Sequence, residues 1–171
     1  MAIEDIYHRW TVQTANNEEL HNELLNIQND REDIEDRFYK ELEFGTGGLR
    51  GVLGAGTNRM NVFTVSKATQ GYSNYLNQQF EKPSVAIGYD SRIHSDDFAR
   101  AAAAVFAANG IQVHIYDHLM PTPALSFAVR DLHCSGGIVL TASHNPAKYM
   151  VQMAVRSRQR LQRQFRLQSM K

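Results

Sequence analysis

The spacing of apolar side chains divides the chain into a helical N-terminal quarter and a longer region of mixed pattern. Residues 4–42 are predicted to be helical, because large apolar side chains recur there at largely helical spacing among charged ones. Asn16 or Asn17 and Asp30 are the candidate N-caps that divide this stretch. Residues 44–56 then hold six of the eleven glycines of the chain, which excludes an ordinary helix.

Beyond residue 56, short apolar runs that suit buried strands alternate with stretches of helical periodicity. This alternation predicts an α/β fold: a three-layer α/β/α domain with a mostly parallel or mixed sheet, preceded by N-terminal helices. The predicted strands cover residues 84–89, 111–116 and 137–140, and the predicted helices run from Asn61 or Thr64 to about Phe80, from Ser95 or Asp96 to Ala108, and from beyond Pro123 to about Leu132.

Polar side chains follow each predicted strand. The first strand ends at Asp90-Ser91-Arg92, the second at Asp117-His118, and the third at the segment Thr141 to His144. Because ligands gather beyond the carboxyl ends of parallel strands, these groups are expected to converge on one rim of the sheet.

Composition narrows the class of protein. With 43% hydrophobic and 21% charged residues, the chain resembles an ordinary soluble domain. Residues 1–150 carry 12 basic and 18 acidic side chains, and this acidic balance argues against a nucleic-acid partner. No apolar stretch approaches the roughly 20 residues that span a bilayer, so no membrane partner is expected. The single Cys134 and the lack of a signal-peptide pattern favour a cytoplasmic location, and no protein partner is inferable.

Ser143 is the first candidate for chemistry. It follows a buried strand and lies in a loop that Pro146 restricts, so its hydroxyl is a candidate nucleophile, with His144 available for proton transfer. The alternative from spacing alone is a loop serine that makes a local hydrogen bond. A hydrolase triad is disfavoured, because adjacent Ser and His rarely face each other and no Gly-x-Ser-x-Gly elbow is present.

The glycine-rich segment Phe44 to Gly51 is the second candidate. Its backbone N–H groups suit an anion-binding nest, to which Arg50 adds a bidentate phosphate clamp. It matches neither a Walker loop nor a dinucleotide fingerprint, and the alternative is a flexible connector. Arg92 either binds an anion or pairs with a nearby aspartate, and the histidines show no metal-binding spacing.

Together, four segments resemble the α-D-phosphohexomutases, the phosphoglucomutase/phosphomannomutase family. Residues 141–146, Thr-Ala-Ser-His-Asn-Pro, resemble the phosphoserine loop, and residues 44–51 resemble the glycine-arginine loop. Residues 88–92, Gly-Tyr-Asp-Ser-Arg, and 121–123, Pro-Thr-Pro, fall where the family has its corresponding strand-end and turn motifs. The resemblance covers roughly residues 40–150 and is strongest to the bacterial phosphoglucomutase branch.

This resemblance implies a reversible conversion between glucose 1-phosphate and glucose 6-phosphate, with a phosphosugar as the substrate partner. Ser143 would carry the phosphate, and His144 would assist its orientation or a proton transfer. Mg²⁺, ligated by a phosphate oxygen on Ser143, is the implied cofactor, with glucose 1,6-bisphosphate as intermediate and activator. The implied phosphate-binding residues are Thr46, Gly47, Gly48, Arg50 and Arg92.

The chain also departs from the family pattern. The family has four domains, whereas this sequence resembles the first, and the Asp-rich metal loop of the second domain has no counterpart here. The family continues Asn-Pro-x-x-Tyr-Asn-Gly-Tyr-Lys, but here Tyr149 is followed by Met150-Val151-Gln152, so the active-site lysine is missing and Lys148 is not at its position.

From the extent of the resemblance and from these departures, we infer that the chain has three parts. We expect a helical extension over residues 1–43, the phosphoserine domain over 44–150, and a basic, glutamine-rich tail over 151–171 that is outside the family pattern. The hypothesis is that a frameshift truncated a four-domain mutase and produced this tail. Negligible turnover is then expected, and the alternative function is a non-catalytic remnant or a phosphosugar-binding module.

Overall fold

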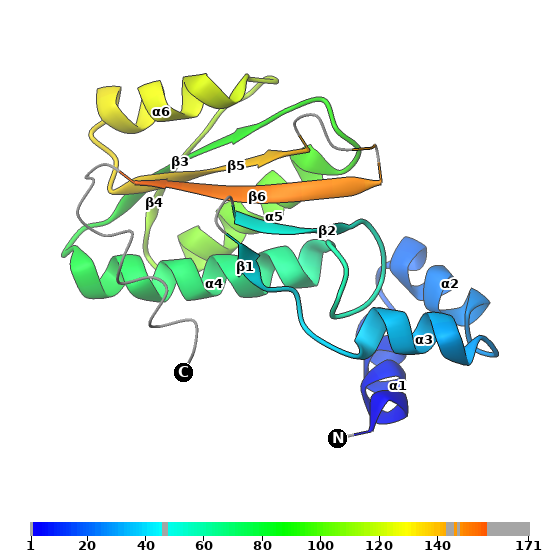
Figure 1. The fold of residues 1–171 in the computed structure, drawn as a ribbon. Coiled ribbons are helices and arrows are strands. Elements are labelled where there is room, and N and C mark those ends of the chain that lie inside the picture. Colours follow the sequence, from blue (N-terminus) through cyan, green and yellow to red (C-terminus); the bar gives the residue numbers. More distant parts are fainter. Residues whose placement is uncertain (1, 46–47, 143–145, 147, 157–171) are drawn as a thin grey trace.

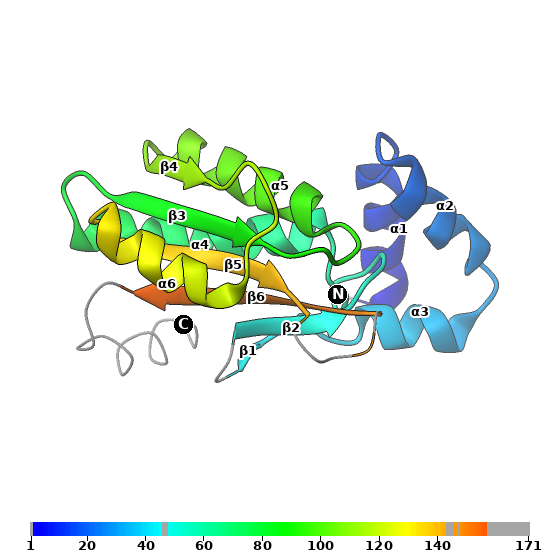
Figure 2. The same ribbon diagram turned by 90° about the horizontal axis from the view of Figure 1, so that it is seen from above.

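The computed structural model describes residues 2–45, 48–142, 146 and 148–156. It contains a six-stranded sheet with helices on both faces and a separate group of three helices at one side (Figure 1, Figure 2). Helix α6 (Thr122–Asp131) covers one face, and helices α4 (Val62–Gln79) and α5 (Ser95–Ala108) cover the other. The predicted three-layer α/β/α fold is therefore confirmed, and its sheet is mixed.

The sheet has the strand order β1-β2-β6-β5-β3-β4. Strands β3, β4 and β5 are mutually parallel, as β3 pairs with both of the others, whereas β6 runs antiparallel to β5 and β2. The strands are β1 (Phe44–Gly45), β2 (Gly48–Val52), β3 (Ser84–Tyr89), β4 (Gln112–Ile115), β5 (Gly136–Thr141) and β6 (Tyr149–Arg156).

The predicted domain boundary at residue 150 is too early. Strand β6 continues to Arg156 and lies between β5 and β2, so residues 151–156 belong to the sheet. Met150 and Val151, on either side of that boundary, are both buried. The proposed frameshift origin of residues 151–171 stays a prediction, and residues 157–171 of that tail lie outside the described residues.

The helix starts follow the predicted caps. The side chain of Asn17 accepts a hydrogen bond from the N–H of Leu20 at 3.1 Å, at the start of α2 (Glu18–Asn26). Asp30 accepts from the N–H of Asp33 at 3.0 Å, at the start of α3 (Arg31–Phe38), which follows α1 (Ile3–Gln13) and α2 in the helical group. Asn61 caps α4 in the same way. None of the helices in the described ranges has the length and apolar character that crossing a bilayer requires.

A partly buried ion-pair network joins the helical group to the sheet domain. Arg37 of α3 contacts Glu23 at 2.6 Å and Asp33 at 2.8 Å, and Glu23 also accepts from the backbone N–H of Ala55 at 2.7 Å. Burial alone lowers the pKa of Arg37, but its hydrogen bonds to the two carboxylates outweigh this and raise it. Gly56, with φ of 132°, fits closely here, because a Cβ would lie 2.7 Å from the carbonyl oxygen of Arg37.

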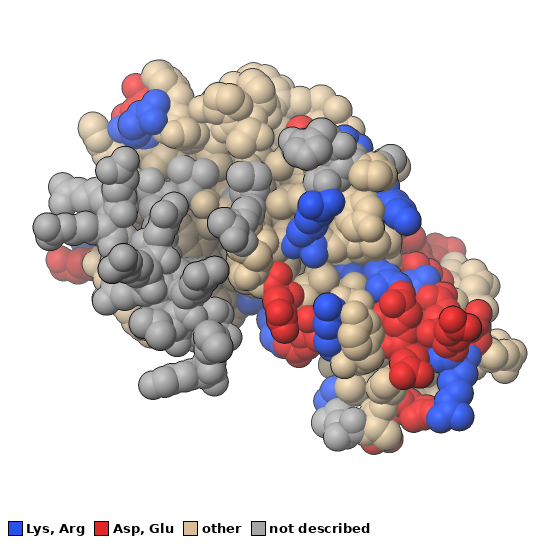
Figure 3. All heavy atoms as spheres, viewed as in Figure 1, with Lys and Arg blue, Asp and Glu red and all other residues tan. Residues whose placement is uncertain are grey.

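The helical group is also strongly acidic. Residues 2–43 carry twelve acidic and four basic side chains, and Figure 3 shows the acidic ones gathered over α1–α3 on the face it draws. The acidic excess of residues 1–150 therefore comes from this group, because residues 44–150 carry 8 basic and 6 acidic side chains.

Candidate functional site

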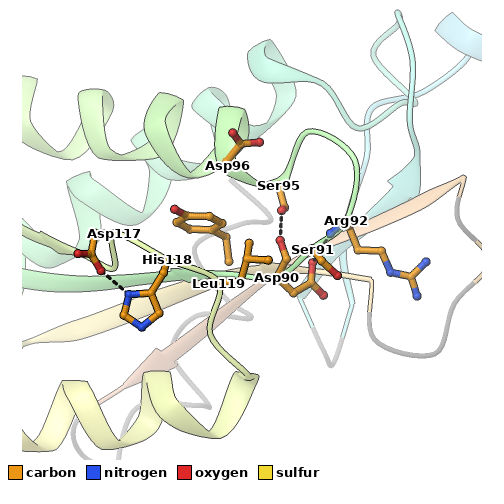
Figure 4. Close-up of a pocket in the computed structure, with 9 residues that line it drawn as sticks. Asp90, Ser91, Arg92, Ser95, Asp96, Asp117, His118 and Leu119 are labelled. Atoms are coloured by element: carbon orange, nitrogen blue, oxygen red, sulfur yellow. Dashed lines mark hydrogen bonds and ion pairs between the residues drawn. The ribbon is translucent and has the colours of Figure 1, made fainter.

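The carboxyl ends of β3 and β4 meet at an open pocket of about 430 Å³ (Figure 4). Because the two strands are parallel and in register, the residues that follow them emerge at the same edge of the sheet. The expected convergence of the strand ends is thus confirmed for this pair. The pocket is lined by Tyr89, Asp90, Ser91, Arg92, Ser95, Asp96, Asp117, His118 and Leu119.

Asp90 connects the end of β3 to the end of β5. One carboxylate oxygen accepts a hydrogen bond from the hydroxyl of Thr141 at 2.5 Å, and the other accepts from the N–H of Arg92 at 3.0 Å. The N–H of Asp90 donates to the carbonyl of Leu140 at 3.2 Å, and its carbonyl accepts from the hydroxyl of Ser95. Asp90 therefore fixes the point at which β5 ends and the predicted phosphoserine loop begins.

The sequence placed Asp90 among the polar residues at the strand ends but did not predict this supporting role. The bond from Arg92 comes from its backbone, in the local Asp-to-N–H pattern of an Asx turn. That turn is a signal that the sequence could have provided. The bond from Thr141 could not be found in this way, because it joins residues 51 positions apart.

Arg92 itself is half-buried at the pocket rim. Figure 4 shows its side chain pointing away from the Asp117–His118 side of the pocket. Asp117 and His118 hydrogen-bond to each other, and this bond, reinforced by the charge of His118, lowers the pKa of the Asp117 carboxyl. The pocket therefore has the hydrogen-bonded pair Asp117–His118 at one end, and the guanidinium of Arg92 points away from the pocket at the other end.

Arg50 lies on β2, two strands away from Thr141 but in the same row of the sheet. Arg50 pairs with Val151 across β2 and β6, and Val151 pairs with Thr141 across β6 and β5. With neighbouring strands about 4.8 Å apart, the backbones of Arg50 and Thr141 are about 10 Å apart. The exposed guanidinium lies 5.3 Å from the centroid of the Tyr149 ring.

Gly48 begins β2 and pairs with Gly45 across the β1–β2 hairpin. Its φ of 118° lies in a region that side chains with a Cβ rarely adopt, so a glycine is required at this point of the hairpin. The predicted connector is therefore a pair of short strands that presents Arg50. Of the remaining predicted site residues, Thr46, Gly47, Ser143 and His144 lie outside the described residues.

The described part of the chain holds no complete metal site. Among those residues, no group of three or more His, Cys, Asp or Glu side chains is arranged to hold a metal ion. They do not by themselves fit a complete Mg²⁺ site.

Residues 41–155 match the family model for phosphoglucomutase/phosphomannomutase, alpha/beta/alpha domain I. Because this match covers more than half of the chain, the chain belongs to the phosphoglucomutase/phosphomannomutase family. The match ends beyond residue 150, in agreement with the extent of β6.

Individual relatives agree with this assignment. The phosphoglucomutase of Staphylococcus aureus strain USA300 is 47% identical over 119 residues, which make up 68% of this chain and 22% of that protein. The phosphoglucomutase of S. aureus strain RF122 is 46% identical over 114 residues, 67% of this chain and 21% of that protein. A crystal structure of a Thermus thermophilus protein assigned as a phosphomannomutase superposes with a TM-score of 0.64 at 36% identity, covering 68% of this chain and 26% of that one. The chain thus spans about a fifth of the length of the curated relatives it matches.

Proposed function

We propose that this chain is the phosphate-carrying first domain of a phosphohexomutase, with Ser143 as the carrier. The complete protein would interconvert glucose 1-phosphate and glucose 6-phosphate. The observation that supports this most is the row formed by Arg50, Val151 and Thr141. It brings a cationic side chain to the sheet edge from which the Ser143 segment continues, within a domain that matches the family.

The chemistry follows from the residue types. Phosphoserine transfers its phosphoryl group to a free hydroxyl of the sugar monophosphate, and the hydroxyl proton passes to the serine oxygen, with His144 assisting. The bisphosphate formed then returns its other phosphoryl group to Ser143. Such transfers depend mainly on positioning and on neutralising the phosphate oxygens, which are the roles we assign to Arg50, Arg92 and the glycine loop at Thr46, Gly47 and Gly48.

Mg²⁺ belongs to this proposal as the cofactor of the complete protein, bound in part through the phosphate on Ser143. When bound, it would neutralise charge on the transferring phosphoryl group. The chain supplies the serine segment, and its described residues support that segment without a complete metal site. We therefore propose that the chain on its own carries out a single phosphoryl transfer and does not sustain turnover.

Reaction with glucose 1,6-bisphosphate tests the proposal. The dephosphorylated chain is mixed with an excess of the bisphosphate and Mg²⁺, and the glucose monophosphate released is measured. We expect about one equivalent per chain, none from S143A, and an unchanged amount from S91A, a serine at the neighbouring strand end. Binding of the bisphosphate without release of monophosphate would instead indicate the alternative, a phosphosugar-binding module without transfer activity.

A further inference from the structure

Two cations contact the same aromatic ring at the end of the loop that begins at Thr141. The guanidinium carbon of Arg50 lies 5.3 Å from the centroid of the Tyr149 ring, and the ammonium nitrogen of Lys148 lies 5.6 Å from it. Because both distances share one centroid, the two charges are at most about 11 Å apart. Arg50 and Lys148 are exposed and Tyr149 is half-buried, so the charges are accessible to a ligand.

The backbone holds this cluster at a fixed place. The carbonyl of Lys148 accepts a hydrogen bond from the N–H of Leu53 at 2.8 Å, and the N–H of Tyr149 donates to the carbonyl of Pro146 at 2.9 Å. Tyr149 also pairs with Val52 on β2. Lys148 is thus attached to the strand that carries Arg50, and it follows the serine-bearing loop directly.

The charge of this cluster is not balanced within the described part of the chain. There, neither Arg50 nor Lys148 takes part in an ion pair, whereas Lys67 pairs with Glu41 at 2.6 Å. Two like charges held near one ring repel each other, and an anion that contacts both removes this repulsion. A phosphate dianion suits such a site, because an arginine offers paired N–H donors and a lysine adds a point charge.

We propose that Arg50, Tyr149 and Lys148 form a binding site for a phosphate monoester, in which Lys148 is a phosphate-binding residue. Tyr149 orients both cations through its ring face. That the ester is a phosphosugar rests on the proposed function, whereas binding of the phosphate group does not.

Titration calorimetry at low salt with inorganic phosphate, and separately with glucose 1-phosphate, tests this site. K148A is expected to weaken both affinities about fivefold, in the range for one exposed charge contact, and K148R to restore them to within about twofold. K40A is the matched control, because the ammonium of Lys40 lies 5.3 Å from the Tyr39 ring in an equivalent contact, to which no second cation is added among the described residues. K40A is expected to bind as the unaltered chain does.

The proposal is overturned if the unaltered chain binds no phosphate, if K148A binds as well as the unaltered chain, or if K40A weakens binding as much as K148A. The near-ultraviolet circular dichroism of each variant shows whether it retains the native fold. If K148A does not fold, loss of phosphate binding by a folded K148R would overturn the proposal instead. If the chain releases no monophosphate but still binds phosphate in a way that depends on Lys148, the proposed function is contradicted and the phosphate-binding site is retained.

Discussion

The hydrogen bond between Thr141 and Asp90 gives a sharp prediction, since it fixes the start of the serine-bearing loop. T141V keeps the shape and β-branching of the side chain but removes the hydroxyl that donates to Asp90 at 2.5 Å. T141S keeps the hydroxyl and removes one methyl group. The two variants therefore separate the hydrogen bond from the packing of the side chain.

The magnitudes follow from burial and charge. Thr141 is 3% exposed, and its hydroxyl donates to a carboxylate, so T141V leaves one carboxylate oxygen without this donor. Hydrogen bonds to charged groups contribute about 1.5–3 kcal/mol, and we expect T141V to lower the free energy of unfolding by about 2 kcal/mol. T141S should cost about 0.8 kcal/mol, the contribution of one buried methyl-sized group.

Urea unfolding followed by circular dichroism measures both effects. With an m-value of about 2 kcal/mol/M, T141V moves the midpoint down by about 1 M and T141S by less than half of that. A double-mutant cycle with D90A should show a coupling energy of about 1–2 kcal/mol. Equal losses for T141V and T141S, or a coupling energy near zero, would refute the assignment of Asp90 as the support of the loop.

Three further predictions concern single side chains. Q152M should raise the free energy of unfolding by about 1 kcal/mol, because the buried side-chain carbonyl oxygen of Gln152 has no hydrogen-bond donor among the described residues. In this variant the hydroxyl of Thr69 keeps its hydrogen bond to a backbone carbonyl. A lower urea midpoint for Q152M would contradict this prediction. Burial raises the pKa of Cys134 above its ordinary 9.0, so iodoacetamide at pH 8 should alkylate this thiol far more slowly in the folded chain than in urea. Equal alkylation rates in the two conditions would contradict this prediction. The pKa of the Asp117 carboxyl should lie below its ordinary 3.8, because His118 hydrogen-bonds to it. The stability that this lowered pKa adds to the fold is present above pH 3.8 and is lost as the pH falls through the lowered pKa. An H118A variant in which Asp117 titrates with the same midpoint by NMR would contradict this cause.

The regular parts of the sheet could be predicted because their signals are local. Strand β3 has the predicted bounds, since a short apolar run after Pro83 suits a strand buried on both faces. Strands β1 and β2 were missed because glycines weaken any strand pattern. Strand β6 was missed because Gln152 occupies a core position between Leu49 and Leu140 of its neighbours, where an apolar residue would have given an uninterrupted apolar run over residues 149–155.

The residues of the candidate site also fall into those with a local sequence signal and those without one. Ser143 and Arg50 were found from motifs that are contiguous in the sequence. The role of Asp90 depends on its hydrogen bond from Thr141, which is far along the chain. The role proposed for Lys148 depends on the Tyr149 ring that it shares with Arg50, and no local pattern contains either arrangement. Sheet register was the missing information, because it places Arg50 and Thr141 in one row.

The mass of the chain after incubation with glucose 1,6-bisphosphate and Mg²⁺ tests the central claim most directly. The account predicts a gain of one phosphoryl group, located on Ser143 by peptide mapping, absent from S143A and retained in S91A. An unchanged mass, or a phosphoryl group on another residue, would contradict the claim that this domain carries phosphate on Ser143.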